Sequence, residues 1–246
     1  MSGRLSRRVF LAGLSAAGGA VLAGCNKDLY VPPHFGGLLD LSDALMMSVQ
    51  RMLLSEQSMA REYSREDLSP TFPVEGTSLP FDVGYQAAMD NGFADWRLPV
   101  EGLVARPLSL SVADLKAMPS RTQITSHSCE SGWTAIGEWT GVPLAHVLEL
   151  AGLDRRARYI AFDCVDGWYD YLDLFDAFHA QTILAYGMNG SDLPTAHGAP
   201  VRLRVERQLG YKSLKFLERI RVVDEPERID YGDAPRLFHY AWYAGI

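Results

Sequence analysis

The chain has 246 residues, of which 48% are apolar and 22% are charged, an ordinary globular composition with enough apolar residues for a core. Its formal net charge is −7, and removal of residues 1–24, which carry three arginines and no acidic residue, leaves −10. Nucleic-acid binding needs clustered Lys and Arg side chains to contact phosphates, so this acidic balance argues against a nucleic-acid partner.

The first residues have the pattern of an export signal. Ser6–Leu11 contains a twin arginine, and the apolar run that follows over residues 9–23 is too short to span a bilayer. The run ends in Leu22–Cys25, which resembles a bacterial lipobox, where the cysteine becomes the new N-terminus and carries acyl chains. We therefore expect a twin-arginine lipoprotein signal peptide over residues 1–24. Export to the periplasmic side and membrane anchoring by lipid on Cys25 would follow, and an uncleaved anchor helix is the alternative.

The segment after this signal is predicted to be a linker that leads into an N-terminal helix, together covering residues 25–70. Apolar residues near helical spacing place that helix over residues 40–66. Residues 67–95 are rich in Pro, Gly and Asp and are predicted to be irregular. A single domain is expected over residues 71–246.

From Trp96 onward the pattern is one of short strands separated by turn signals. Helices are predicted over residues 112–118 and 144–150, the second one ending at Gly152. A tight turn is predicted at residues 189–190. Strands are predicted over residues 96–104, 121–128, 159–165, 182–188, 201–205 and 217–223. Mixed short strands with few helices indicate an α+β fold in which strands predominate.

Cys129 follows one of these strands, in a turn rich in Ser and Gly that can present its sulfur outward. A thiolate at such a place is a soft metal ligand. From this stretch alone three alternatives remain open, namely a buried structural cysteine, a nucleophile and a metal ligand.

Four further motifs stand in order after the Cys129–Trp133 motif. They are Trp139–Leu144, Ala185–Gly190, His197–Arg202 and Gly210–Phe216. Together, in this order and at this spacing, the motifs resemble the molybdopterin-binding domain of the sulfite oxidase family over residues 71–224. The resemblance is closer to the bacterial exported branch, which includes the catalytic subunit of periplasmic methionine sulfoxide reductase. It implies a sulfite-oxidase-type α+β fold with mixed short-stranded sheets and few helices.

The resemblance also implies a cofactor and its ligands. Cys129 would supply the protein sulfur to the metal of a molybdenum–molybdopterin cofactor. The residues that would contact the cofactor or the pterin phosphate are Cys164, His197, Arg202, Ser213, Leu214 and Lys215. The segment Thr71–Gly76 is expected to replace upstream pterin contacts of the family. Phosphate binding needs cations and backbone N–H groups, which Arg202, Lys215 and the turn at residues 210–213 can supply.

A disulfide between Cys129 and Cys164 is the alternative for an exported chain, but it would consume the thiolate that the metal requires. The resemblance implies that Cys164 stays reduced. Four other arginines are expected to be solvated, namely Arg204, Arg207, Arg219 and Arg221.

The implied activity is two-electron oxidoreduction at molybdenum, with oxygen-atom transfer on a small sulfur compound of the sulfite or sulfoxide type. Candidates for the substrate side are His127, Trp133, Asp166, Trp168 and Tyr169, although both tryptophans could equally be core residues. The sequence contains no C-x-x-C-H haem motif, so a membrane haem protein or a soluble cytochrome is expected to exchange electrons with the chain. The rival interpretation is a non-catalytic exported lipoprotein that uses the same fold to bind a ligand or a partner.

Overall fold

The computed structural model describes residue 45 and residues 48–225, so the predicted signal peptide, Cys25 and the end of the chain lie outside the described residues. The chain divides into two units at residues 55 and 56. In the first unit, residues 48–53 are helical. None of the helices in the described part of the chain has the length and apolarity needed to cross a membrane.

The helix predicted over residues 40–66 was wrong at its C-terminal end, because the helical backbone stops at Leu53. The cause lies in long-range pairing. The Ala60 N–H donates to Gln181 Oε1 and the Ala60 carbonyl accepts from Gln181 Nε2, while Glu62 forms a β-bridge with Thr125. These contacts require extended backbone, so the tertiary partners override the local apolar spacing.

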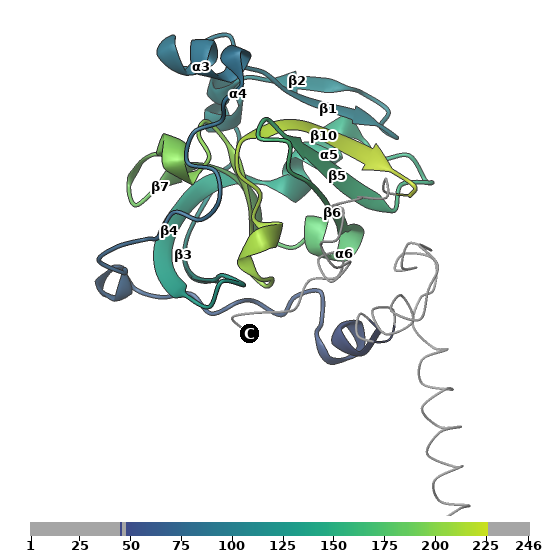
Figure 1. Cartoon of the computed structure of the whole chain (residues 1–246). Helices are drawn as coiled ribbons and strands as arrows, with labels where there is room; N and C mark the ends of the chain where they lie inside the picture. The colour runs from purple at the N-terminus through teal and green to yellow at the C-terminus, as the bar shows by residue number, and fades with distance from the viewer. Residues whose placement is uncertain (1–44, 46–47, 226–246) are drawn as a thin grey trace, which may run out of the picture. The chain divides into compact units, whose positions relative to one another are not determined.

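The first of two five-stranded sheets has the strand order β2-β1-β10-β5-β6 (Figure 1). Its strands are β1 (Leu98–Gly102), β2 (Leu108–Leu110), β5 (Tyr159–Cys164), β6 (Tyr169–Asp173) and β10 (Leu217–Val223). β1 and β10 run parallel, and all other neighbours are antiparallel. Strands β5 and β10 were predicted within one residue of their bounds, whereas β2 and β6 were missed.

The second sheet has the order β3-β4-β7-β8, with β9 also pairing with β7. Its strands are β3 (Arg121–Ser128), β4 (Thr134–Pro143), β7 (Thr182–Met188), β8 (Ser191–Asp192) and β9 (Arg202–Val205). All pairs are antiparallel. The predicted turn at residues 189–190 is confirmed, since Asn189 and Gly190 both have positive φ and connect β7 to β8. The sequence analysis missed β4, the longest strand.

The helices are short and lie between strands. They are α3 (Val83–Asp90), α4 (Val112–Ala117), α5 (Leu144–Ala151) and α6 (Leu174–Ala177), with 3-10 turns η1 (Arg65–Asp67), η2 (Thr195–His197) and η3 (Gly210–Lys212). Both predicted helices in the domain are confirmed: α4 starts at a Ser111–Asp114 capping box, and α5 ends at Gly152 with φ 70°. Helix α3 lies within the segment that was predicted to be irregular, and Asp82 caps it by accepting from the Tyr85 N–H.

The main core is made of apolar residues from both sheets and from α5. β1 contributes Leu98 and Val100, β5 Ile160 and Phe162, β10 Ile220 and Val222, β4 Val142, β7 Leu184, β9 Leu203, and α5 Leu144, Val147 and Leu148. All of them are fully buried. The arrangement is the predicted α+β fold with mixed short-stranded sheets, in which two layers share one core.

The second sheet is strongly bent, as the curved ribbons of β3 and β4 show (Figure 1). The pairing of β4 with β7 shifts register between Thr140 and Gly141, an irregularity that bends a strand. Glycine is required there, since a Cβ on Gly141 would lie 2.2 Å from the Leu184 carbonyl oxygen. The bend lets side chains of the outer strands β3 and β9 meet, and Arg204 contacts His127 in this way.

Candidate functional site

A pocket with about 800 Å³ of empty space, open solvent at its mouth included, lies where the loops of the second sheet meet residues 210–215. Four stretches of chain form its walls: residues 72–77, 127–133, 166–168 and 197–215. The lining residues are Phe72, Pro73, Glu75, Gly76, Thr77, His127, Cys129, Glu130, Trp133, Asp166, Trp168, His197, Arg202, Gly210, Tyr211, Ser213, Leu214 and Lys215.

Cys129 sits directly after β3, in a turn that backbone hydrogen bonds close. Its N–H donates to the Trp133 carbonyl at 2.9 Å, and the Gly132 N–H donates to the Cys129 carbonyl at 3.1 Å. The Ser131 N–H donates to Sγ at 3.5 Å, and Sγ lies 3.3 Å from Ser131 Oγ. Burial raises the pKa of the Cys129 thiol, while the hydrogen bonds with Ser131 lower it. The sulfur is thus fixed on the pocket wall, and it is free of any disulfide.

Two cations, Arg202 and Lys215, lie on the same pocket wall. Burial, followed by repulsion from Arg204, lowers the pKa of Arg202 to about 9. Burial and repulsion from Arg202 lower the pKa of Lys215 to about 8. In the described part of the chain, neither forms an ion pair with a carboxylate, and the buried Nε of Arg202 has no hydrogen-bond partner. Arg202 is buried and Lys215 half-buried, and positive charge withdrawn from water without a direct ion pair favours an anion, so this wall suits a bound phosphate.

Hydrogen bonds to backbone carbonyls fix both cations in place. Arg202 donates from Nη1 to the His197 carbonyl at 3.0 Å and from Nη2 to the Ser213 carbonyl at 2.6 Å. Lys215 donates to the carbonyls of Glu75, Thr77 and Ala196. The lysine therefore ties the upstream segment to the pocket, where the sequence analysis expected Thr71–Gly76 to contribute contacts. Four residues of that stretch line the pocket, namely Phe72, Pro73, Glu75 and Gly76.

Aromatic rings and carboxylates form the remaining walls. The Phe72 ring lies within 6 Å of four other rings, those of His127, Trp133, Trp139 and His197. Trp133 Nε1 donates to Glu75 Oε2 at 3.0 Å, and this hydrogen bond lowers the pKa of Glu75. The tryptophan therefore serves the pocket wall rather than the main core, which resolves the two alternatives that the sequence left open for it.

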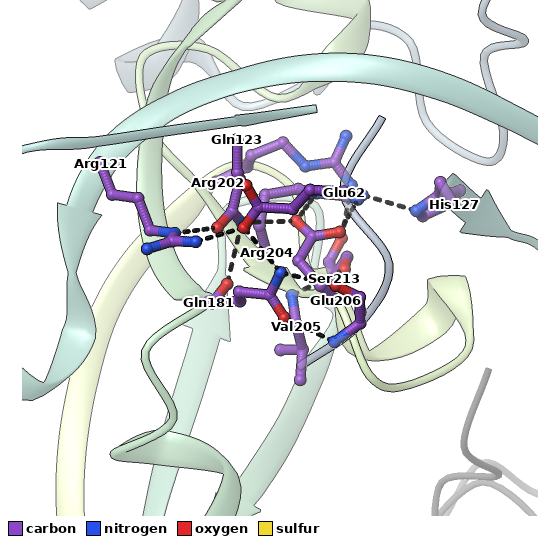
Figure 2. Close-up of polar contacts among 11 residues, drawn as sticks. Glu62, Arg121, Gln123, His127, Gln181, Arg202, Arg204, Val205, Glu206 and Ser213 are labelled. Carbon is purple, nitrogen blue, oxygen red and sulfur yellow. Dashed lines mark hydrogen bonds and ion pairs between the residues drawn. The ribbon is translucent and has the colours of Figure 1, made fainter. Parts of the chain in front are cut away.

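His127 is the last inward-facing residue of β3. Its Nδ1 lies 2.5 Å from Nη1 of Arg204, which is itself paired with Glu206 (Figure 2). Burial lowers the pKa of His127 well below its ordinary value, and the guanidinium groups of Arg204 and Arg202 lower it further. His197, across the pocket, has a pKa lowered to about 4 for the same reasons, burial first and Arg202 second.

The pocket brings together most of the predicted site residues. Cys129, His127, Trp168, His197, Arg202, Ser213, Leu214 and Lys215 all line it. Two predicted residues lie elsewhere. Cys164 is part of the main core, reduced and 4% exposed, and Tyr169 packs against the cluster formed by Tyr159, Ala161 and Tyr171 on the first sheet.

The expectation that four arginines are solvated was wrong for two of them. Arg204 pairs with Glu206 and Arg207 with Asp176, and the side chains of both arginines are 1% exposed. One sequence feature indicated this burial: Arg204 stands between the apolar residues Leu203 and Val205 in β9, and Glu206 follows directly after the strand. Arg219 and Arg221 pair with Asp163 and are partly exposed.

A metal at this pocket would find one protein ligand of the soft type, Cys129. No group of three or more His, Cys, Asp or Glu side chains within residues 48–225 is arranged to hold a metal ion. A soft metal beside Cys129 therefore needs further ligands from a bound carrier, and the uncompensated cations nearby fit a carrier that bears a phosphate.

Comparisons with known proteins agree with this chemistry. The sequence model of the family described as "Oxidoreductase molybdopterin binding domain" matches residues 84–231. A methionine-sulfoxide reductase subunit, YedZ1 of Azospira oryzae, is 35% identical over 66% of this chain and 63% of its own length. The oxidoreductase YuiH of Bacillus subtilis is 33% identical over 70% of this chain and 83% of its own length.

The match to the methionine-sulfoxide reductase catalytic subunit MsrP of Xanthomonas campestris is 33% identical and covers 57% of this chain. The chain spans 48% of the length of that relative. Among solved structures, the sulfane dehydrogenase SoxCD from Paracoccus pantotrophus matches with a TM-score of 0.54 at 22% identity, over 61% of this chain and 44% of that one. This last likeness concerns the fold.

Proposed function

Since the chain belongs to the molybdopterin-binding oxidoreductase domain family, that of the sulfite oxidases, we propose that it carries out oxygen-atom transfer on a small sulfur compound. Its cofactor is molybdenum–molybdopterin. The observation that carries the proposal is the meeting in one pocket of a thiol, Cys129, with the buried Arg202 and the half-buried Lys215, neither of which forms an ion pair in the described part of the chain. A phosphate-bearing metal carrier satisfies both requirements at once.

Different pocket residues would bind the metal and the phosphate of this cofactor. Cys129 would bind the metal through Sγ, and the Ser131 N–H, which already donates to that sulfur, would tune its charge. Arg202 and Lys215 would bind the pterin phosphate together with the backbone at Ser213 and Leu214. The bound cofactor supplies a two-electron redox centre, and the protein provides its position and its electrostatic surroundings.

The charges that remain after the cofactor phosphate is neutralised select the substrate. Besides Arg202 and Lys215, the charged residues that line the pocket are the carboxylates Glu75, Glu130 and Asp166. An oxyanion such as sulfite would be repelled by these carboxylates, whereas a neutral sulfoxide would not. The aromatic rings of Phe72, Trp133 and Trp168 offer apolar contact for a thioether chain. We therefore favour sulfoxide reduction, the activity named for two of the relatives.

Electrons for this reaction are proposed to come from a separate haem protein, either in the membrane or as a soluble cytochrome, since the sequence carries no haem-binding C-x-x-C-H motif. The export signal and the lipobox Cys25 support a place on the periplasmic side, anchored by lipid. Their residues lie outside the described part of the chain.

The test is metal content combined with activity. Protein purified from a molybdate-fed host with a working twin-arginine pathway should contain about one molybdenum per chain and reduce sulfoxides with a dye donor. Cys129→Ser should lower kcat at least about 100-fold, because the hard hydroxyl is a poor substitute for the thiolate. Cys164→Ser is the matched control, and it should keep the metal, since Cys164 lies outside the pocket lining.

Two results would contradict the proposal. Native protein that carries no molybdenum would favour the rival interpretation, a non-catalytic lipoprotein that binds a ligand or a partner. Enzyme that oxidises sulfite faster than it reduces sulfoxides would show that the carboxylates do not select the substrate.

A further inference from the structure

Two outer strands of the second sheet place polar side chains on one buried face. On β3, Gln123, Thr125 and His127 alternate inward and are at most 8% exposed. On β9, Arg204 points to the same interior, and Glu206 follows two residues later, with side chains 1% and 0% exposed. The bend of the sheet brings the two sets into contact although 77 residues separate His127 from Arg204. This network faces the candidate site, and no role in the proposed function has been assigned to Arg204 or Glu206.

Glu206 fixes the orientation of Arg204. The guanidinium donates from Nε to Glu206 Oε1 at 3.0 Å and from Nη2 to Oε2 at 2.7 Å, a two-point contact that sets the plane of the group. The guanidinium carbon lies 4.2 Å from the centre of the Trp139 ring, which supports that plane from one side. Gln123 Nε2 in turn donates to Glu206 Oε1 at 2.9 Å. Nη1 is thereby aimed at His127 (Figure 2).

In the hydrogen bond between Arg204 and His127, the arginine must be the donor. A guanidinium has five N–H donors and no acceptor, so Nη1 must donate across the 2.5 Å to Nδ1. Nδ1 must then offer its lone pair, and the proton of the neutral ring must sit on Nε2. The arginine thus selects one of the two tautomers of the imidazole.

The Nε2 atom of His127 faces Gly210, and both residues line the pocket. A Cβ built on Gly210 would approach it to 2.5 Å, and Gly210, His127 and Cys129 all line the same cavity. The absence of a side chain at residue 210 therefore leaves room for the N–H of His127 beside the cysteine.

We propose that Arg204 and Glu206 are positioning residues that hold His127 in its Nε2–H form, so that the ring donates a hydrogen bond to the oxygen of the substrate. The inference rests on the proposed function, since a sulfoxide is the substrate that offers such an oxygen. A fixed donor that needs no reorientation stabilises the negative charge of a polarised S–O bond. The arginine and the glutamate act through the histidine and do not touch the substrate.

The first test reads the tautomer directly by NMR. The mature holoenzyme, labelled with ¹⁵N-histidine, should show a protonated Nε2 and an unprotonated Nδ1 for His127. The chain has six histidines, and His127→Gln identifies the signals by their loss. A proton on Nδ1, or a mixture of tautomers in the wild-type protein, would overturn the inference without any further variant.

Variants of the buried pair extend this test. Arg204→Met combined with Glu206→Leu removes both charges together, so no buried charge is left unpaired. This double variant should lose the single tautomer and show both forms. Arg204→Lys, which keeps a cationic donor, should retain the Nε2–H form. An unchanged His127 spectrum in the double variant would show that the pair does not set the tautomer.

Kinetics connect the tautomer to the reaction. With methionine sulfoxide and a dye donor, the double variant should lose roughly 10- to 100-fold in kcat. Removal of one fixed hydrogen-bond donor costs about 100-fold or more, so a misplaced donor should cost that much or less, and KM should change far less. Arg204→Lys should recover most of that loss. Arg219→Met is the matched control on the first sheet, 45% exposed and paired with Asp163, and should leave both spectrum and rate unchanged.

The two proposals fail separately. If the wild-type spectrum and its variants behave as expected but no sulfoxide is reduced, the proposed function is wrong and the positioning of His127 stands. If sulfoxide is reduced and the double variant keeps the wild-type kcat, the positioning role is wrong and the function stands.

Discussion

Gly210 is the residue that leaves space for the ring of His127. Its Cβ, if present, would lie 2.5 Å from Nε2 and 2.8 Å from Cε1 of that ring. The ring cannot move aside at low cost, because Arg204 holds it from one side and Phe72 and Trp133 pack against it. The glycine is therefore needed for the space it leaves and not for an unusual backbone angle.

The prediction at this position is steric. Gly210→Ala should destabilise the protein by about 1–3 kcal/mol in urea unfolding, the usual cost of forcing extra volume into a packed site. The control is a double-mutant cycle with His127→Ala, which removes the obstructing ring. In that background the alanine at residue 210 should add almost no further loss. A full additional loss would place the clash elsewhere.

Cys164 is the cofactor residue implied by the resemblance that lies outside the pocket lining. The alignment of motifs placed it beside the cofactor, yet its side chain belongs to the main core, and burial raises its pKa well above the ordinary value. Cys164 is the last residue of β5, and the pocket-lining residues Asp166 and Trp168 follow it within four positions. By contrast, Arg202 and Lys215 were predicted from motif and charge together, and both line the pocket.

At the scale of elements, the pairing of β4 with β7 controls the bend on which the site depends. The two strands approach so closely at Gly141 that a Cβ would lie 2.2 Å from the Leu184 oxygen and 2.6 Å from Ala185 Cα. Both obstructing atoms are backbone, so no side-chain rotation relieves the contact.

Gly141→Ala should therefore cost roughly 3 kcal/mol or more of unfolding free energy, at or beyond the upper end for overpacking. Gly187→Ala is the matched control on the partner strand, where the nearest atom is 3.2 Å from the ideal Cβ position. It should change the unfolding free energy by less than about 1 kcal/mol, because alanine has less conformational freedom to lose than glycine and this offsets the mild crowding. Equal losses for the two variants, measured by urea titration, would contradict the assignment of the close contact to residue 141.

The strands differ in how far the sequence predicts them, and the reason is composition. β3, β7 and β10 were predicted because β-branched and apolar residues alternate or run together. β4 was missed because its Gly137, Gly141 and Pro143 read as turn signals, and β6 because two of its five residues are Asp. In both cases the pairing with neighbouring strands overrides weak local preference.

The site residues that belong to sequence motifs were predictable, and the contacts that depend on the shape of the sheet were not. Cys129 and Lys215 lie within motifs, but the contact between His127 and Arg204 depends on the bend of a whole sheet. The spacing of residues along the sequence does not indicate a contact between positions 127 and 204. From its charge alone, Arg204 was expected to be exposed to solvent.

At the scale of the molecule, buried histidines couple folding to pH. His179 is 3% exposed and accepts a hydrogen bond from the Gln181 N–H. Burial, followed by the charge of Arg207, lowers its pKa from 6.5 to about 4. Between pH 6.5 and about pH 4, His179 is therefore protonated in the unfolded chain and neutral in the folded protein.

The sign follows from this difference. The stabilisation is complete above pH 6.5 and is lost as the pH falls through about 4. Between pH 7 and pH 4.5 His179 should contribute a loss of roughly 2 kcal/mol. His179→Asn, whose Oδ1 can accept from the Gln181 N–H, should flatten the curve of unfolding free energy against pH by that amount. Parallel curves for the variant and the wild type would contradict the assignment.

The walls of the pocket come from stretches between residues 72 and 215, and Lys215 joins its last stretch to carbonyls near residue 75. A ribosome must therefore have released nearly all of the described chain before a complete anion wall exists. An anion bound at this wall therefore reports on a completed fold.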